Sequence, residues 1–207
     1  MVTFDADVTP YDPAGFANFR DGLGWEFEAD RCAVLVHDLL PYYTGVLAEQ
    51  TRSAVVDQCR TLVDWAFGQS MPVIASAPRP AAVVRQRGLG GSLWGQGPSA
   101  AEAAQSCLDG MDEPAVPWIR KRSLSAFYAT DLAVELTRQG KDQLVVCGVF
   151  ASQGIVATSF DALARDLQLF VVSDAVADYN AVLHELALRQ IARSTGQIIP
   201  TADLTTS

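Results

Sequence analysis

Basic residues are few in this chain of 207 residues. Lys and Arg total 15 against 24 Asp and Glu, which gives a net charge of -9 at pH 7. No basic stripe runs along the sequence, so a nucleic acid is not expected as a partner, because phosphate backbones are bound by clustered cations. An anionic small molecule would have to be held by a few local Lys or Arg side chains.

Long apolar runs are missing, and so are closely spaced cysteines. No segment approaches the roughly 20 apolar residues of a membrane-spanning helix, and the N-terminus lacks the apolar stretch of a signal peptide. The four cysteines, Cys32, Cys59, Cys107 and Cys147, form no CxxC pair, so no metal site is expected. These absences predict a cytoplasmic, reduced protein with no membrane partner, no metal and no cofactor.

The chain does contain enough apolar sequence for one hydrophobic core. Hydrophobic residues make up 49% of it, and at this length one domain is favoured over two. Residues 1–30 are interpreted as an irregular N-terminal arm with a short helix near Pro13–Gly22. Residues 31–207 are interpreted as a single domain.

Within that domain, apolar strand-like segments alternate with segments of helical periodicity. Strands that are apolar throughout are typical of a parallel sheet covered on both faces. We therefore predict an α/β protein with three layers, α/β/α, around a central parallel six-stranded sheet. Gly- and Pro-rich residues 78–100 are interpreted as a long loop. The predicted strands cover 33–37, 71–78, 114–121, 142–150, 168–176 and 196–200, and the predicted helices cover 48–68, 131–140, 154–167 and 181–195.

Three segments carry reactive side chains at the ends of predicted strands. Asp38 follows the first strand, Lys121 ends the third, and the sequence GVFASQG ends the fourth. Ligands bind beyond the carboxyl ends of parallel strands, so these segments are expected to meet at one site. A helix N-cap is the structural alternative for Asp38, and a solvated cation is the alternative for Lys121.

Taken together, these segments resemble the isochorismatase-like hydrolase family, whose fold is Rossmann-like. AVLVHDLLPYY is similar to its first strand, with the catalytic aspartate at Asp38. WIRKRSLSAF is similar to its lysine segment, with the catalytic lysine at Lys121. The stretch LVVCGVFASQGIVATSFDALARDLQLFVVSDAVADY resembles the long signature that begins at the fourth strand. RGLGGSLWGQG resembles a loop of the isochorismatase branch and contains Arg87 and Trp94.

One position separates the branches of this family. Its amidohydrolases use an Asp–Lys–Cys triad, with the cysteine at the start of the helix after the fourth strand. This chain has Gly154 there, as the isochorismatase branch does, and glycine cannot attack a carbonyl. The resemblance therefore implies hydrolysis of the enolpyruvyl (vinyl) ether of isochorismate or its amino analogue, with release of pyruvate. No aryl-carrier domain is expected after the hydrolase segment, and this expectation favours 2-amino-2-deoxyisochorismate and a diffusible dihydro-hydroxyanthranilate-type product of secondary metabolism.

This chemistry assigns roles to ten residues. A vinyl ether is activated by protonation of its methylene carbon, so one positioned acid and one water suffice. We predict that Asp38 is the acid, that Lys121 orients it and pairs a substrate carboxylate, and that Gly154 leaves backbone N–H groups available to an anion. The predicted substrate-binding residues are Arg87, Trp94, Tyr42, Leu124, Phe127, Ser152 and Gln153.

The chain departs from the branch pattern at three positions. Leu124 stands where the branch has a tyrosine, Ser152 where it has a histidine, and Ala77 where it has a glutamine. These changes leave two alternatives open, a non-catalytic or altered-substrate member of the same fold and, less favoured, an amidohydrolase that uses water directly. The family resemblance also implies a homodimer. His37 is expected to make a buried structural hydrogen bond, and His184 is expected at the surface or in an interface.

Overall fold

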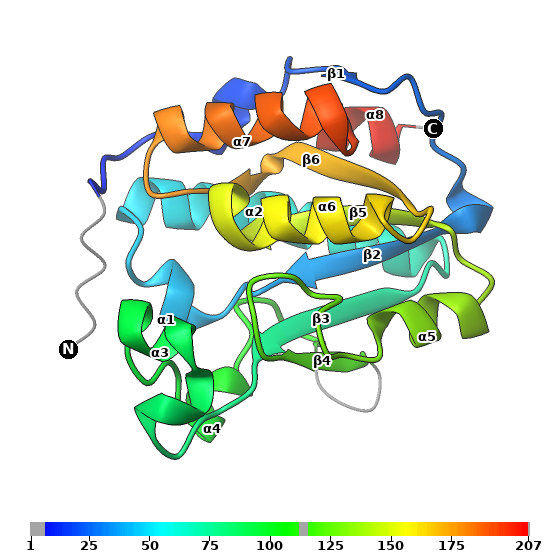
Figure 1. Cartoon of the computed structure of the whole chain (residues 1–207). Helices are drawn as coiled ribbons and strands as arrows, with labels where there is room; N and C mark the ends of the chain where they lie inside the picture. Colours follow the sequence, from blue (N-terminus) through cyan, green and yellow to red (C-terminus); the bar gives the residue numbers. More distant parts are fainter. Residues whose placement is uncertain (1–6, 112–115, 207) are drawn as a thin grey trace.

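The computed structural model describes residues 7–111 and 116–206. These residues form a sheet of seven strands in the order β1-β7-β6-β5-β2-β3-β4, with helices on both faces (Figure 1). All neighbouring strands pair in parallel except β1 (Asp21–Gly22), which the N-terminal arm adds antiparallel to β7 (Gln197–Ile199). The predicted α/β/α fold with six parallel strands is thus confirmed, and one short edge strand is added to it.

The central strands are buried on both faces. β2 (Cys32–His37), β3 (Val73–Pro78) and β5 (Gln143–Val149) are buried at every position, and β6 (Gln168–Ala177) at all but its first. β4 (Trp118–Lys121), at the edge of the sheet, alternates between buried and half-buried residues. Burial on both faces explains the continuous apolar runs in the sequence. Residues 114 and 115 of the third predicted strand, like residues 1–6 of the arm, lie outside the described residues.

Two layers of helices cover the sheet. One layer packs on the face that Val34 and Val36 share, and the other packs on the face of Ala33 and Leu35. Among the described residues, no helix is long and apolar enough to cross a membrane. The first layer contains α2 (Glu49–Gly68) and α8 (Thr201–Thr205), and the second contains α5 (Leu132–Arg138), α6 (Val156–Leu163) and α7 (Ala181–Ser194).

Several short elements differ from the sequence prediction. Residues 78–100 are not one long loop, because they contain a 3-10 turn and a short helix, α3 (Leu89–Trp94). Gly88 and Gly95 have φ values of 59° and 70° and flank α3, so these glycines mark its two ends. The arm's predicted helix is only a 3-10 turn. The remaining short elements are η1 (Pro13–Phe16), η2 (Ala29–Arg31), α1 (Pro41–Thr44), η3 (Val84–Arg87), α4 (Ala100–Ala103) and the π-helical turn η4 (Ala151–Ile155).

His184 anchors the N-terminal arm. The sequence analysis expected this residue at the surface or in an interface, but it is fully buried. Its Nε2 donates to the carbonyl of Ser173 at 3.0 Å, and its Nδ1 accepts from the Tyr11 hydroxyl at 3.0 Å. A carbonyl can only accept, so the ring proton is on Nε2. The Tyr11 oxygen in turn accepts from the backbone N–H of Asp178 at 2.8 Å. Burial lowers the pKa of His184 to about 4, so the ring is neutral near pH 7.

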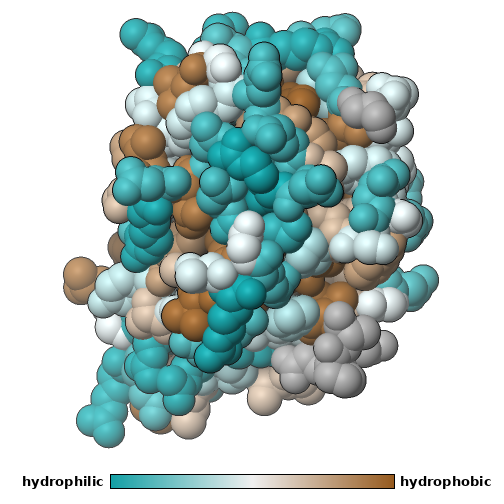
Figure 2. Space-filling model, turned by 90° about the vertical axis from the view of Figure 1, so that its right-hand side faces the viewer, coloured by the Kyte–Doolittle hydropathy of each residue, from teal (hydrophilic) through white to brown (hydrophobic). Residues whose placement is uncertain are grey.

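Short helices gather at one end of the strands. α1 and α3 lie beyond the carboxyl ends, on the left of Figure 1. Figure 2 shows the face on the opposite side, where apolar residues form small patches that hydrophilic side chains separate. The elements that build a site are therefore gathered at the carboxyl ends of the strands.

Candidate active site

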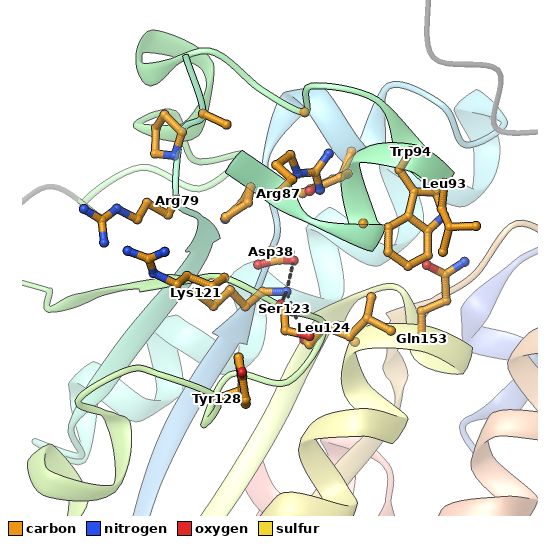
Figure 3. A pocket seen from close by; sticks show the side chains of 18 of the residues that line it. Asp38, Arg79, Arg87, Leu93, Trp94, Lys121, Ser123, Leu124, Tyr128 and Gln153 are labelled. Carbon is orange, nitrogen blue, oxygen red and sulfur yellow. Dashed lines mark hydrogen bonds and ion pairs between the residues drawn. The ribbon is translucent and has the colours of Figure 1, made fainter. Parts of the chain in front are cut away.

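A cavity of about 810 Å³ lies at the carboxyl ends of β2, β3 and β4 (Figure 3). Asp38 lies near its centre, with Arg79 on one side and Trp94, Leu93 and Gln153 on the other. The lining comes from the ends of these strands, from the segment that contains η3 and α3, and from the turn that follows β5. This is the edge of the sheet at which the sequence predicted a site.

Asp38 is held by groups from two neighbouring strands. It directly follows β2 and is 6% exposed. Its Oδ2 lies 2.7 Å from Nζ of Lys121, at the end of β4, and its Oδ1 accepts from the Ser76 hydroxyl of β3 at 2.9 Å. The backbone of Asp38 is left-handed, with φ of 51°, a conformation uncommon outside glycine that often marks functional positions. Its N–H donates to the same Ser76 oxygen at 3.2 Å, which fixes this turn.

Lys121 is buried together with Asp38, at 5% exposure. Besides contacting Asp38, its ammonium group donates to the backbone carbonyls of Ser123 at 3.3 Å and Leu124 at 3.0 Å. An ammonium group has three N–H donors, and here each one has an acceptor. A buried ion pair persists only when its remaining hydrogen bonds are satisfied, and this pair meets that condition.

Gly154 leaves space that the His37 ring fills. A Cβ built on Gly154 would overlap Cε1 of His37 and lie 3.0 Å from Nε2. His37 is fully buried, and its Nδ1 donates to the carbonyl of Val149 at 2.9 Å, so the predicted structural hydrogen bond is confirmed. Burial lowers the pKa of His37 to about 4, and the ring is therefore neutral near pH 7. Any side chain at position 154 would have to displace this ring.

Arg87 lines the cavity and also fixes the segment that carries it. Its Nη1 donates to the carbonyl of Gly95 at 2.7 Å, just after α3. A Cβ on Gly97 would lie 2.8 Å from the same nitrogen, so glycine at 97 makes room for the guanidinium. Among the described residues this is the one hydrogen bond that the Arg87 side chain donates, and a guanidinium has five N–H donors.

Eight of the ten predicted site residues line this cavity, and two do not. Phe127 is buried in the core at 4% exposure, where the Arg165 guanidinium lies 5.1 Å from its ring centre. It was expected to wall the substrate, but it packs beneath the site. Ser152 also lies outside the lining, and its N–H donates to Oδ2 of Asp178 at 2.6 Å. The residues that line the cavity are Asp38, Lys121, Gly154, Arg87, Trp94, Tyr42, Leu124 and Gln153.

Other functional residues were missed from the sequence. Ser76, which holds Asp38, was not predicted, and neither were Arg79, Arg122, Leu93 and Tyr128, which line the cavity. Both arginines come directly after a strand, a position that could have pointed to them. Nothing in the sequence distinguishes Leu93 or Tyr128 from core residues.

Comparison with known proteins agrees with this geometry. The family model for the isochorismatase domain matches residues 32–203. The chain belongs to the isochorismatase family. As a member it is a hydrolase of the isochorismatase type, since its relatives include proteins named as isochorismatases.

Two curated relatives and one solved structure illustrate the similarity within the isochorismatase family. Phenazine biosynthesis protein PhzD of Pseudomonas fluorescens is 32% identical over 181 residues, which cover 87% of each chain. Enterobactin synthase component B of Escherichia coli is 30% identical over 89% of this chain and 66% of its own length. An isochorismatase family protein from Burkholderia thailandensis superposes with a TM-score of 0.76 at 23% identity, covering 91% of this chain and 98% of that one.

Proposed function

We propose that this protein hydrolyses the enolpyruvyl ether of an isochorismate-type substrate and releases pyruvate. The observation that carries the proposal is the buried pair of Asp38 and Lys121, 2.7 Å apart, in a cavity where residue 154 is glycine. The site offers one positioned acid and no thiol nucleophile at that position. Vinyl-ether hydrolysis needs only the acid and a water.

The reaction proceeds through a cation next to the ether oxygen. Protonated Asp38 gives its proton to the methylene carbon of the vinyl group, which becomes a methyl group and leaves an oxocarbenium ion. Water adds to the cationic carbon and loses one proton, which restores the carboxyl group of Asp38. The resulting hemiketal moves its hydroxyl proton to the ring oxygen as the C–O bond breaks. The products are pyruvate and the ring alcohol, and the net consumption is one water.

Lys121 can contact both Asp38 and a carboxylate of the substrate. The ammonium group lies 2.7 Å from Oδ2 of Asp38. A substrate carboxylate beside Lys121 competes for the same ammonium group and adds a negative charge next to Asp38. The substrate carboxylate is in this way held next to Asp38, the acid of the proposed reaction.

The departures from the branch pattern leave this machinery intact. Leu124 replaces a tyrosine, but it serves Lys121 through its backbone carbonyl, which any residue supplies. Ala77 is fully buried in β3 and is not part of the cavity lining. Asp38, Lys121 and Ser76 are all present and in contact. This supports a catalytic protein over a non-catalytic member of the fold.

The ring substituent is the finer part of the proposal, and we favour 2-amino-2-deoxyisochorismate. The similarity to phenazine biosynthesis protein PhzD supports this choice, because the match covers 87% of both chains. The match to enterobactin synthase component B covers only 66% of that protein.

Pyruvate release from the purified protein tests both parts of the proposal. Isochorismate and 2-amino-2-deoxyisochorismate are supplied separately, and Asp38→Asn serves as the control, with its fold checked by circular dichroism. We expect release that is at least about a thousandfold slower in Asp38→Asn, because the amide has no proton to give. Undiminished release in Asp38→Asn would refute the role of Asp38. Absence of release from both substrates would refute the proposed reaction.

A further inference from the structure

Arg79 and Arg122 emerge side by side at the mouth of the cavity. β3 and β4 pair in parallel with Pro78 opposite Lys121, and the N–H of Arg79 donates to the carbonyl of Lys121 at 2.8 Å. The two arginines are therefore the first residues beyond two adjacent strands, whose spacing is roughly 5 Å. Both are exposed and both line the cavity. Figure 3 shows Arg79 on the side of Asp38 away from Trp94.

No described residue forms an ion pair with either arginine. Neither arginine has an acidic partner among residues 7–111 and 116–206, and Asp38, the only acidic residue of the cavity lining, is paired with Lys121. Like charges on neighbouring strands repel each other. Six other arginines of this acidic protein form ion pairs with carboxylates, Arg20, Arg31, Arg60, Arg138, Arg165 and Arg189. Exposed Arg85 and Arg193 form none among the described residues, but neither lines the cavity.

Such a pair of guanidinium groups suits a carboxylate. A guanidinium presents a rigid fork of N–H donors that matches the two oxygens of a carboxylate, and two adjacent forks bind one anion from two directions. A carboxylate placed between Arg79 and Arg122 would also relieve their mutual repulsion. The cavity thus contains an anion site separate from the buried ammonium of Lys121.

The depth of the two sites indicates which carboxylate each one binds. Asp38 and Lys121 lie at the floor, 6% and 5% exposed, and the vinyl group must lie there to receive the proton. The ring carboxylate of an isochorismate-type substrate is meta to the ether oxygen and extends away from the reacting carbon. We propose that Arg79 and Arg122 bind this ring carboxylate at the mouth, an inference that rests on the proposed function. The substrate class is therefore a ring that carries a free carboxylate in addition to the enolpyruvyl one.

Three stable probes separate the two anion sites. 3-(Carboxymethoxy)benzoate has both carboxylates, 3-methoxybenzoate has only the ring carboxylate, and phenoxyacetate has only the side-chain carboxylate. Binding is measured by isothermal titration calorimetry for the wild type and for Arg79→Gln/Arg122→Gln. We expect the double variant to bind the first two probes about tenfold or more weakly, because charge-assisted hydrogen bonds are lost. Phenoxyacetate should bind equally to both proteins.

Arg85 supplies the matched control. It is an exposed arginine of η3 that does not line the cavity, so Arg85→Gln removes a nearby charge without touching the site. Equal losses for all three probes, equal losses in Arg85→Gln, no loss for the dicarboxylate, or failure of the wild type to bind the dicarboxylate would each overturn the inference. Pyruvate release is measured separately. Binding with the expected pattern but without turnover would keep the anion site and refute the proposed hydrolysis.

Discussion

At the residue scale, Asp38 is fixed by one hydroxyl and one ammonium group. Ser76 donates to Oδ1 at 2.9 Å, and Lys121 lies 2.7 Å from Oδ2. The two carboxylate oxygens have different partners, because Oδ2 contacts the charged ammonium group and Oδ1 contacts a neutral hydroxyl. A carboxyl group held at both oxygens cannot rotate away from the substrate, and such positioning is worth a large part of a catalytic rate.

Ser76→Ala tests this positioning without removing a charge. Oδ1 loses its hydroxyl donor and the Asp38 carboxyl group gains rotational freedom. We expect kcat for pyruvate release to fall about tenfold with little change in KM. The free energy of unfolding should fall by about 1 kcal/mol. Steady-state kinetics and urea denaturation measure the two effects, and an unchanged kcat would show that Ser76 does not position Asp38.

Gly154→Ala tests the contact with His37. The new methyl group would enter the volume of the imidazole ring, so we expect the free energy of unfolding to fall by about 1–3 kcal/mol. His37→Ala opens that volume and should make Gly154→Ala nearly neutral when the two are combined. A double-mutant cycle by urea denaturation measures this coupling. Strictly additive effects would show that the ring and residue 154 do not compete for space.

At the element scale, the N-terminal arm is connected to the turn beside the cavity. Asp178 follows β6 and accepts from the N–H of Ser152 in η4, two residues before Gly154. The N–H of Asp178 donates to the hydroxyl of Tyr11. The arm thus holds Asp178 in place, and Asp178 in turn holds η4. Burial raises the pKa of Asp178, and two backbone N–H groups that it accepts from lower it in part. The arm is therefore part of the structure that shapes the site.

Tyr11→Phe tests this connection with almost no change in volume. Removal of the hydroxyl leaves the Asp178 N–H and Nδ1 of His184 without their partner. We expect the free energy of unfolding to fall by about 1–3 kcal/mol, since buried polar groups without partners are costly. Urea denaturation at pH 7 measures the change. Tyr42→Phe, which alters a half-buried tyrosine of the cavity, is the matched control and should change stability by less.

The elements that the sequence predicted well are those whose pattern is set by burial alone. The five longest strands and helices α2 and α7 carry continuous or periodic apolar residues, and these were placed to within a few positions. Helix α3 was missed because three of its six residues are not helix formers by themselves, Gly90, Gly91 and Ser92, and its ends are set by flanking glycines.

Single residues were harder to predict where a distant partner decides their place. His184 was expected near the surface, but Tyr11, 173 positions away, pairs with it in the interior. Phe127 follows the segment that contains Lys121, as in the family pattern, yet it packs in the core and does not line the cavity. Asp38 and Lys121 were placed at one site because strand ends converge whatever the details of packing. Gly154 was singled out by the family resemblance.

At the scale of the whole molecule, two buried histidines make stability depend on pH. Burial lowers the pKa of His37 and of His184 to about 4, from an ordinary value of 6.5. The unfolded chain therefore binds protons first as the pH falls. The contribution of the two neutral histidines to the free energy of unfolding is complete above about pH 6.5, and it is lost progressively between pH 6.5 and 4. Each histidine accounts for about 3 kcal/mol over this window. The raised pKa of Asp178 acts in the opposite direction and reduces the total loss.

Urea denaturation between pH 7 and pH 4 measures this dependence. The free energy of unfolding of the wild type should fall steadily through the window. In His184→Gln, which has no proton to gain at this position, the curve should be lower at pH 7 but shallower below pH 6.5. An identical slope in the wild type and the variant would contradict the assignment to His184.

The contact between His37 and Gly154 also constrains the evolutionary path between the two chemistries of the family. A cysteine introduced at position 154 alone would meet the imidazole ring before its sulfur could serve as a nucleophile. A smaller residue at position 37 has to be in place before or together with the cysteine. We therefore expect Gly154→Cys alone to lower the free energy of unfolding, and a smaller residue at position 37 to restore it.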